Sequence, residues 1–160
     1  MLHQFYLYTI DLENYQTRYL PPTLMPYKLE FEQELKRGIR RFQAELHWED
    51  MWDIPTVNRR LGEGYRFVVF RPDCGVRGWA WLTPKYEIKN VYVYKTYRGL
   101  GWGKNLYYYL LNEAWTLEYP FVTVRVDIWN VSAMKVVEKV AEVTGCGLDL
   151  KLVEEEYVRD

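Results

Sequence analysis

The apolar residues of this chain follow two different spacings, which predict strands and helices in a mixed order. Short apolar runs rich in β-branched and aromatic residues, bounded by turn residues, predict strands. Apolar residues three and four positions apart predict amphipathic helices. The predicted strands cover residues 5–10, 65–70, 77–82, 87–94, 122–128 and 148–153, and the predicted helices cover 27–48, 55–61, 104–117 and 133–143. The order is therefore β, α, α, β, β, β, α, β, α, β.

The connections between these elements predict how the strands pair. The three strands within residues 65–94 are joined by short turns, which predicts an antiparallel meander. A strand, a helix and a strand follow one another over residues 87–128, which predicts a crossover that brings two strands side by side in parallel. Asp53 is a candidate N-cap for the second helix, because Pro55 follows it in the first turn.

Composition narrows the class of protein. The chain has 160 residues, 49% of them apolar, which suits one domain covering residues 1–160. The formal net charge is −1 and no basic run stands out, so nucleic acid is not an expected partner. No apolar segment approaches the roughly 20 residues of a membrane span, so no membrane partner is expected and we expect a cytoplasmic protein. With two cysteines and two histidines, no metal site is expected either.

A glycine-rich turn between the fourth strand and the third helix is the clearest functional signal. Gly99, Gly101 and Gly103 occupy alternate positions directly before the helix. Glycine permits positive φ and has no Cβ, so several backbone N–H groups can converge on an anion at the positive end of the helix dipole. The turn therefore predicts a phosphate-binding loop.

The residues around the glycines separate three kinds of phosphate loop. A dinucleotide loop would need glycine where Lys104 stands, and a P-loop would need glycine at Arg98 and Ser or Thr at Asn105. The pattern R-x-x-G-x-G over residues 98–103 instead resembles the coenzyme A loop of the GNAT N-acetyltransferase superfamily. The element order resembles the GNAT fold over nearly the whole chain. This resemblance implies an α/β (α+β) fold with a mixed, mostly antiparallel sheet of six to seven strands flanked by about four helices.

The resemblance also implies which residues hold acetyl-CoA, the expected co-substrate. In the family the fourth strand splays from the fifth, its exposed backbone pairs with the pantetheine arm, and loop amides bind the pyrophosphate. An N-x-x-A motif at the start of the last helix faces the arm. The matching residues are Val91 and Val93 on the strand, Arg98, Gly99, Gly101, Trp102, Gly103 and Lys104 in the loop, and Asn130 and Ser132 in the motif. Helix capping is the structural alternative for Asn130.

Glu87 is the leading catalytic candidate. It lies where histone-acetylating members of the superfamily carry a glutamate that acts as general base, directly or through water. A partly desolvated glutamate beside a cleft would have a raised pKa and be a better base. The alternative is that a glutamate at the start of a strand is only a turn residue.

Three further positions complete the expected site. Asp127 and Trp129, at the end of the fifth strand, are expected on the acceptor side, with core packing as the alternative for Trp129. Val137 stands where family members often carry a tyrosine that protonates the departing thiolate. The thiolate can leave without an acid, because a thiol pKa is about 8.5. Otherwise Tyr107 or Tyr108 would have to reach in from the preceding helix.

The function implied is transfer of an acetyl group from acetyl-CoA to a primary amine by direct attack, with Glu87 as base. The acceptor could be a small-molecule amine or a protein amine. A non-catalytic GNAT-like module that binds coenzyme A or a protein partner is the alternative from another class, and a nucleotide-binding enzyme with the same loop is a third reading. The family usually adds a seventh strand, for which the sequence leaves little room after the sixth. A partner subunit could supply that wall, and a homodimer is compatible with the sequence but not required by it.

Overall fold

The computed structural model describes residues 2–46 and 53–156, and these form seven strands and four α-helices. Two short 3₁₀ turns, at Leu29–Phe31 and Lys95–Tyr97, precede α1 and α3. The mixed α/β class expected from the sequence is confirmed. The elements are β1 (Leu2–Asp11), β2 (Leu24–Pro26), α1 (Glu32–Leu46), α2 (Ile54–Gly62), β3 (Arg66–Phe70), β4 (Gly78–Leu82), β5 (Glu87–Val93), α3 (Trp102–Thr116), β6 (Phe121–Asp127), α4 (Val131–Thr144) and β7 (Leu148–Glu156).

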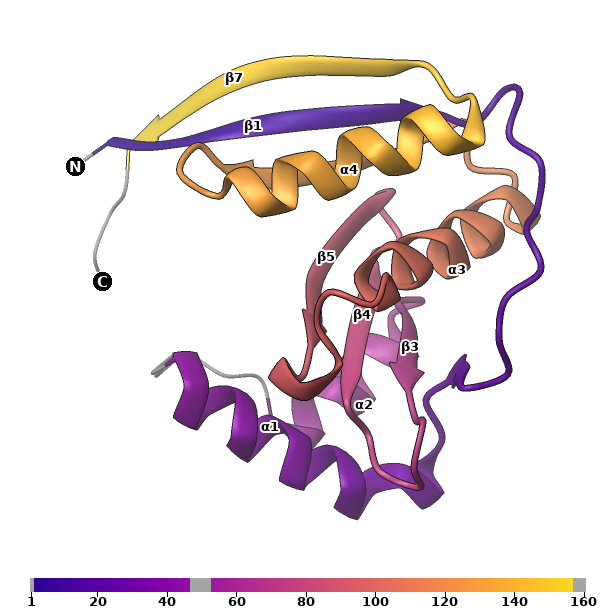
Figure 1. The fold of residues 1–160 in the computed structure, drawn as a ribbon, viewed down its shortest axis with the longest axis vertical. Helices are drawn as coiled ribbons and strands as arrows, with labels where there is room; N and C mark the ends of the chain where they lie inside the picture. Colours follow the sequence, from indigo (N-terminus) through magenta and orange to yellow (C-terminus); the bar gives the residue numbers. More distant parts are fainter. Residues whose placement is uncertain (1, 47–52, 157–160) are drawn as a thin grey trace.

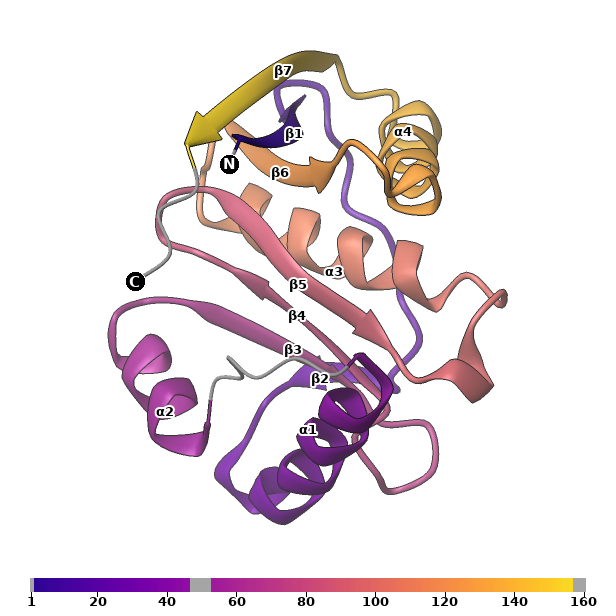
Figure 2. The same ribbon diagram turned by 90° about the vertical axis from the view of Figure 1, so that its left-hand side faces the viewer.

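All seven strands belong to one sheet, in the order β2-β3-β4-β5-β6-β1-β7 (Figures 1 and 2). Every neighbouring pair is antiparallel except β5 and β6, which are parallel. The predicted meander is therefore β3-β4-β5, and the predicted crossover is β5-α3-β6. Both are confirmed.

Two apolar cores lie on opposite faces of the sheet. One core packs α3 and α4 against the sheet, and the other packs α1 and α2 against its β3-β4-β5 half. The continuous apolar run of β3 divides between them, because successive side chains of a strand point to opposite faces. Val68 and Phe70 lie in the α3 core, whereas Phe67 and Val69 lie in the α1 core. The sheet is thus covered on both faces where the site elements meet.

The N-terminal strand completes the far arm of the sheet. β1 lies between β6 and β7, so that Tyr6 is paired with Val126 on one side and Leu152 on the other. The sequence predicted six to seven strands, and the seven strands of the sheet confirm that range. The alternative that a partner subunit supplies a missing strand is not needed for this arm, because the chain's own first strand lies between β6 and β7. The strand that was missed is β2, three residues among prolines, which are too few to show a period.

The first long helix begins later than predicted. The sequence predicted a helix from residue 27, but α1 starts at Glu32 after the 3₁₀ turn. The N–H of Tyr27 donates to the carbonyl of Phe67 at 2.9 Å and so continues the pairing of β2 with β3. A backbone donor that the sheet uses is not free for a helix. The predicted end at residue 48 lies outside the described residues.

Gly78 sets the close approach of β4 to β5, and it provides a stability prediction. A Cβ built there would lie 2.6 Å from the carbonyl oxygen of Tyr92. We expect Gly78→Ala to lower the free energy of unfolding by about 1–3 kcal/mol, because buried backbone must shift to relieve the clash. Urea unfolding followed by tryptophan fluorescence measures the change. Gly62→Ala is the matched control, since nothing lies within 4 Å of its Cβ, and an equal loss in both variants would contradict the steric explanation.

Candidate active site

The parallel strands β5 and β6 separate almost as soon as they pair. Their register contains only Glu87 opposite Thr123 and Ile88 opposite Val124, although β5 continues to Val93 and β6 to Asp127. From residue 89 onward the backbone of β5 therefore has no strand partner on its β6 side among the described residues. Figure 2 shows the two strands diverging from this point, with α3 behind them.

A bulge in β5 accompanies the separation. The register of β5 against β4 shifts between Trp79 and Trp81, and Asn90 has φ of 57°. Asparagine adopts this left-handed conformation more readily than most residues. A bulge bends and twists its strand, and so turns β5 away from β6. Asn90 was the available sequence signal, an asparagine inside a β-type run, and it was missed.

The glycine loop lies between the end of β5 and the start of α3, beyond the point where β5 and β6 part. Gly99 and Gly101 have φ of 80° and 87°, which favour glycine, and Gly101 is the N-cap of α3. A Cβ on Gly99, Gly101 or Gly103 would meet no atom within 4 Å. The first N–H groups of a helix have no partner within it, and the dipole of this 15-residue helix adds positive potential there. The loop is therefore an open, electropositive cradle that fits a pyrophosphate.

The side chain of Arg98 turns back from this cradle. Its Nε–H donates to the carbonyl oxygen of Val93 at 2.9 Å, and its guanidinium pairs with the Glu45 carboxylate of α1. The hydroxyl of Tyr92 donates to the other oxygen of Glu45 at 2.7 Å. Burial, and then Glu45, raise the pKa of Tyr92. Glu45 offsets the charge of Arg98, so the loop amides remain the main anion donors. No sequence pattern pointed to Glu45.

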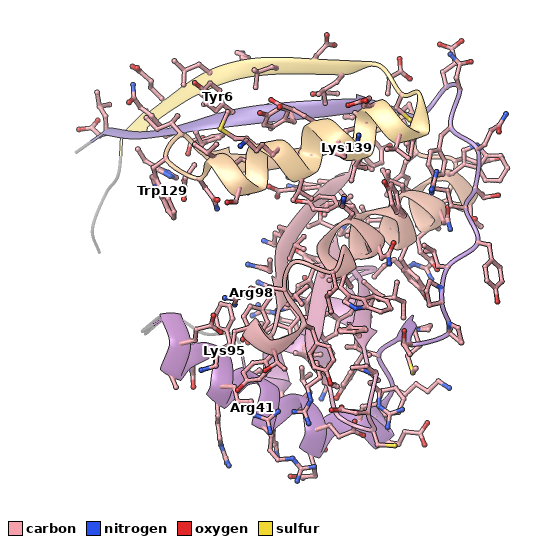
Figure 3. All side chains as sticks on the ribbon, viewed as in Figure 1. Tyr6, Arg41, Lys95, Arg98, Trp129 and Lys139 are labelled. Carbon is pink, nitrogen blue, oxygen red and sulfur yellow. The ribbon has the colours of Figure 1, made fainter. Side chains whose placement is uncertain are left out.

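The side chains of the other loop residues differ in how far they are buried. The Trp102 ring stacks on Phe70, with centroids 4.2 Å apart, so this residue offers a ligand its backbone only. Lys104 lies half-buried in the first turn of α3. Figure 3 shows Arg98 with Lys95 and Arg41 where the loop meets α1.

Glu87 lies at the closed end of the separation, on the sheet face opposite α3. Ile88 is buried in the α3 core, so its neighbours in β5 point to the other face. A carboxylate oxygen of Glu87 lies 3.3 Å from Nε of Arg125 on β6, and the Glu87 N–H donates to the Thr83 hydroxyl at 3.2 Å. Its side chain is 22% exposed. Its side chain therefore links the two strands at the point where they part.

The remaining predicted residues fall on the β6 arm. Asn130 caps α4, as its Oδ1 accepts the Ala133 N–H at 3.2 Å, and Ser132 is exposed in the same turn. The Asp127 carboxylate lies 2.5 Å from Nε2 of His3. Trp129 is 75% exposed at the end of this arm, so the core alternative for it is wrong (Figure 3).

The side chains of Val91 and Val93 pack on the α3 core, which leaves their backbone as the functional part. The candidates for a general acid, Tyr107 and Tyr108, are each 6% exposed in the same core. Burial raises the pKa of Tyr107. Neither tyrosine is therefore placed to donate a proton to an open site.

Two further features, metal-binding groups and membrane-spanning helices, concern only the described residues. No group of three or more His, Cys, Asp and Glu side chains among residues 2–46 and 53–156 could hold a metal ion. None of the helices in these ranges is both long and apolar enough to span a bilayer.

The sheet divides between two parallel strands, and an open helix N-terminus lies beside the division. These features define an α/β protein that can hold an extended, phosphate-bearing ligand. The chain belongs to the acetyltransferase (GNAT) family, whose model matches residues 25–141. This family uses acetyl-CoA as acetyl donor. No curated protein matches the sequence. The matched segment begins in β2, so β1 lies outside it.

Solved structures share the fold at low sequence identity. A GNAT-family protein of Novosphingobium aromaticivorans is 16% identical, with a TM-score of 0.70 over 96% of this chain and 63% of its own. An aminoglycoside acetyltransferase from an uncultured soil sample is 15% identical, with a TM-score of 0.64 over 86% and 95%. The Salmonella typhimurium protein yncA, solved with its cofactor acetyl-CoA, is 20% identical, with a TM-score of 0.58 over 86% and 96%. The chain therefore spans less than two thirds of the first of these.

The link between Glu45 and Arg98 predicts an effect on the stability of the fold. We expect Glu45→Gln to lower the free energy of unfolding by about 1 kcal/mol, because Arg98 loses its counter-charge and Tyr92 a charged acceptor. Glu32→Gln on the same helix is the matched control. Its exposed pair with Lys36, at 4.0 Å, should be worth less than about 0.5 kcal/mol. Equal effects of the two variants in urea unfolding would show that the link adds nothing.

Proposed function

We propose that this protein is an N-acetyltransferase that moves the acetyl group of acetyl-CoA to a primary amine, with residues 1–160 acting as one acyltransferase domain. The observation that supports this most is the division between β5 and β6, with an open glycine loop directly after β5. Main-chain groups on two sides of one opening can hold a phosphate and an amide-bearing arm together. Membership of the acetyltransferase family agrees with this proposal.

The donor is held by backbone groups. The free N–H groups of residues 101–104 bind the pyrophosphate, because they point at the anion from the positive end of α3. The edge of β5 that has no strand partner, at Val91 and Val93, holds the pantetheine arm by strand-like pairing, although the Val93 carbonyl already accepts the Arg98 Nε–H. Ser132 is exposed in the first turn of α4 and faces the same arm. Lys104 adds positive charge beside the loop.

Glu87 acts as the general base for the amine. Acetyl-CoA supplies an activated thioester, whose acetyl group passes to the amine nitrogen as the C–S bond breaks and sulfur keeps the electron pair. Glu87 removes the amine proton, directly or through a water, from its position where β5 and β6 part. Because Val137 replaces the usual tyrosine and Tyr107 and Tyr108 are buried, we propose that the thiolate leaves without a side-chain acid. Asp127 and Trp129 border the acceptor side.

The loop assignment predicts a specific loss of donor affinity. We expect Gly101→Ala to weaken coenzyme A binding at least roughly tenfold, since a Cβ strains a residue at φ of 87° and enters the anion cradle. Isothermal titration with coenzyme A measures it. Gly145→Ala is the matched control, because Gly145 also has positive φ and open space but ends α4. Unchanged affinity in Gly101→Ala would remove the coenzyme from this loop.

The base assignment predicts a loss of turnover without a loss of donor binding. We expect Glu87→Gln to lower kcat by roughly 10²–10⁴-fold, because the amide cannot take the proton. Coenzyme affinity should stay as in the unmodified protein. Thiol release from acetyl-CoA, followed over a panel of amines, gives kcat, with Glu63→Gln as an exposed control in the same charge class. Coenzyme binding without release on any amine would identify a non-catalytic module instead.

A further inference from the structure

A group of cations surrounds Glu87 on the acceptor face of the sheet. Lys89 is two residues further along β5, so its side chain shares the face of Glu87. Trp81 of β4 is paired with Lys89, and the Arg60 guanidinium of α2 lies 5.2 Å from the Trp81 ring centroid. Arg125 approaches from β6 and contacts Glu87 itself. Charged side chains from three elements, β5, α2 and β6, thus lie near one another.

The negative charges at this place are fewer than the positive ones. Arg125 forms ion pairs with Glu87 and, at 3.9 Å, with Glu155 of β7. Lys89 and Arg60 have no carboxylate partner among residues 2–46 and 53–156, and Nη1 of Arg60 is buried without a hydrogen-bond acceptor there. Burial lowers the pKa of Lys89, and Arg60 lowers it further. Three cations therefore face two carboxylates.

Such an excess of positive charge lowers the stability of a folded protein. Half-buried cations lose hydration, and like charges repel unless an anion lies between them. Groups arranged at this cost are found chiefly at functional sites. A carboxylate that accepted hydrogen bonds from Lys89 and Arg60 would lie between the two cations and offset their repulsion.

We propose that Lys89 and Arg60 bind a carboxylate of the acceptor, so that the acetylated amine belongs to an amino acid or a short peptide-like amino acid derivative. The inference rests on the proposed acetyl transfer and specifies its acceptor. The amine lies at Glu87 and the carboxylate at Lys89, two strand positions or about 7 Å apart along β5. This spacing fits an amine and an acid separated by few bonds.

The charge balance favours one carboxylate over other ligands. One excess positive charge matches a monoanion, whereas a phosphate dianion would leave the site negative. A polyamine or an aminoglycoside brings several ammonium groups, which Lys89, Arg60 and Arg125 would repel. The acceptor class therefore differs from that of the soil aminoglycoside acetyltransferase, although the folds are alike.

The test compares amines that differ only in the carboxylate. The full-length protein with acetyl-CoA is assayed for thiol release with the standard amino acids, with their amides, and with the polyamine spermidine. We expect kcat/KM for the best amino acid to exceed that of its amide by roughly 10–100-fold, the worth of hydrogen bonds to a charged group. Lys89→Gln should remove most of this preference by raising KM for the amino acid while changing the amide little.

Three controls separate the outcomes. Lys28→Gln, an exposed lysine before α1, should leave the preference unchanged. A melting temperature for each variant detects loss of fold, and Lys89→Arg should restore part of the preference. Amides or spermidine used as well as amino acids would overturn the acceptor class alone, with acetyl transfer intact. No release on any amine would overturn the acetyl transfer, and this inference with it.

Discussion

The short parallel contact between β5 and β6 is the constraint on which the rest of the structure depends. Two residue pairs join the halves of the sheet, and beyond them backbone groups are left for a ligand. A ladder of two residue pairs contributes few hydrogen bonds. Packing against one face of the sheet must therefore hold the two halves together. The α3 helix does this, because Leu106, Leu110 and Leu111 are fully buried in a core that touches strands of both halves. The helix that supplies the anion cradle thus also bridges the division.

The β5 side of the opening is braced by polar contacts. The Glu45 carboxylate of α1 forms an ion pair with Arg98 of the loop and accepts a hydrogen bond from the Tyr92 hydroxyl of β5. Arg98 also donates to the last carbonyl of β5. This arrangement ties α1 to β5 and to the loop that follows it. A loop held in this way needs little rearrangement to accept a phosphate, which reduces the entropic cost of binding.

The far arm is built differently from what the chain order suggests. β1 lies between β6 and β7, outside the segment that the family model matches. It brings His3 to Asp127 and places Phe5 under the Arg125 guanidinium, at 5.1 Å from its ring centroid. Arg125 in turn contacts Glu87. The N-terminal strand therefore helps to position the proposed base as well as to complete the sheet.

The sequence by itself determined the element types, the meander and the crossover, and it indicated a phosphate-binding loop, because each rests on local signals. Periodicity, turn residues and three alternate glycines act within a few positions along the chain. Only the tertiary structure decided where β1 lies, that β2 exists, that Glu45 holds Arg98, and that Lys89, Arg60 and Arg125 gather around Glu87. These depend on contacts between residues far apart in the chain, which no local pattern records. The loop could therefore point to a phosphate-bearing donor, whereas the charges proposed to bind an acceptor come together only when β5, β6 and α2 meet.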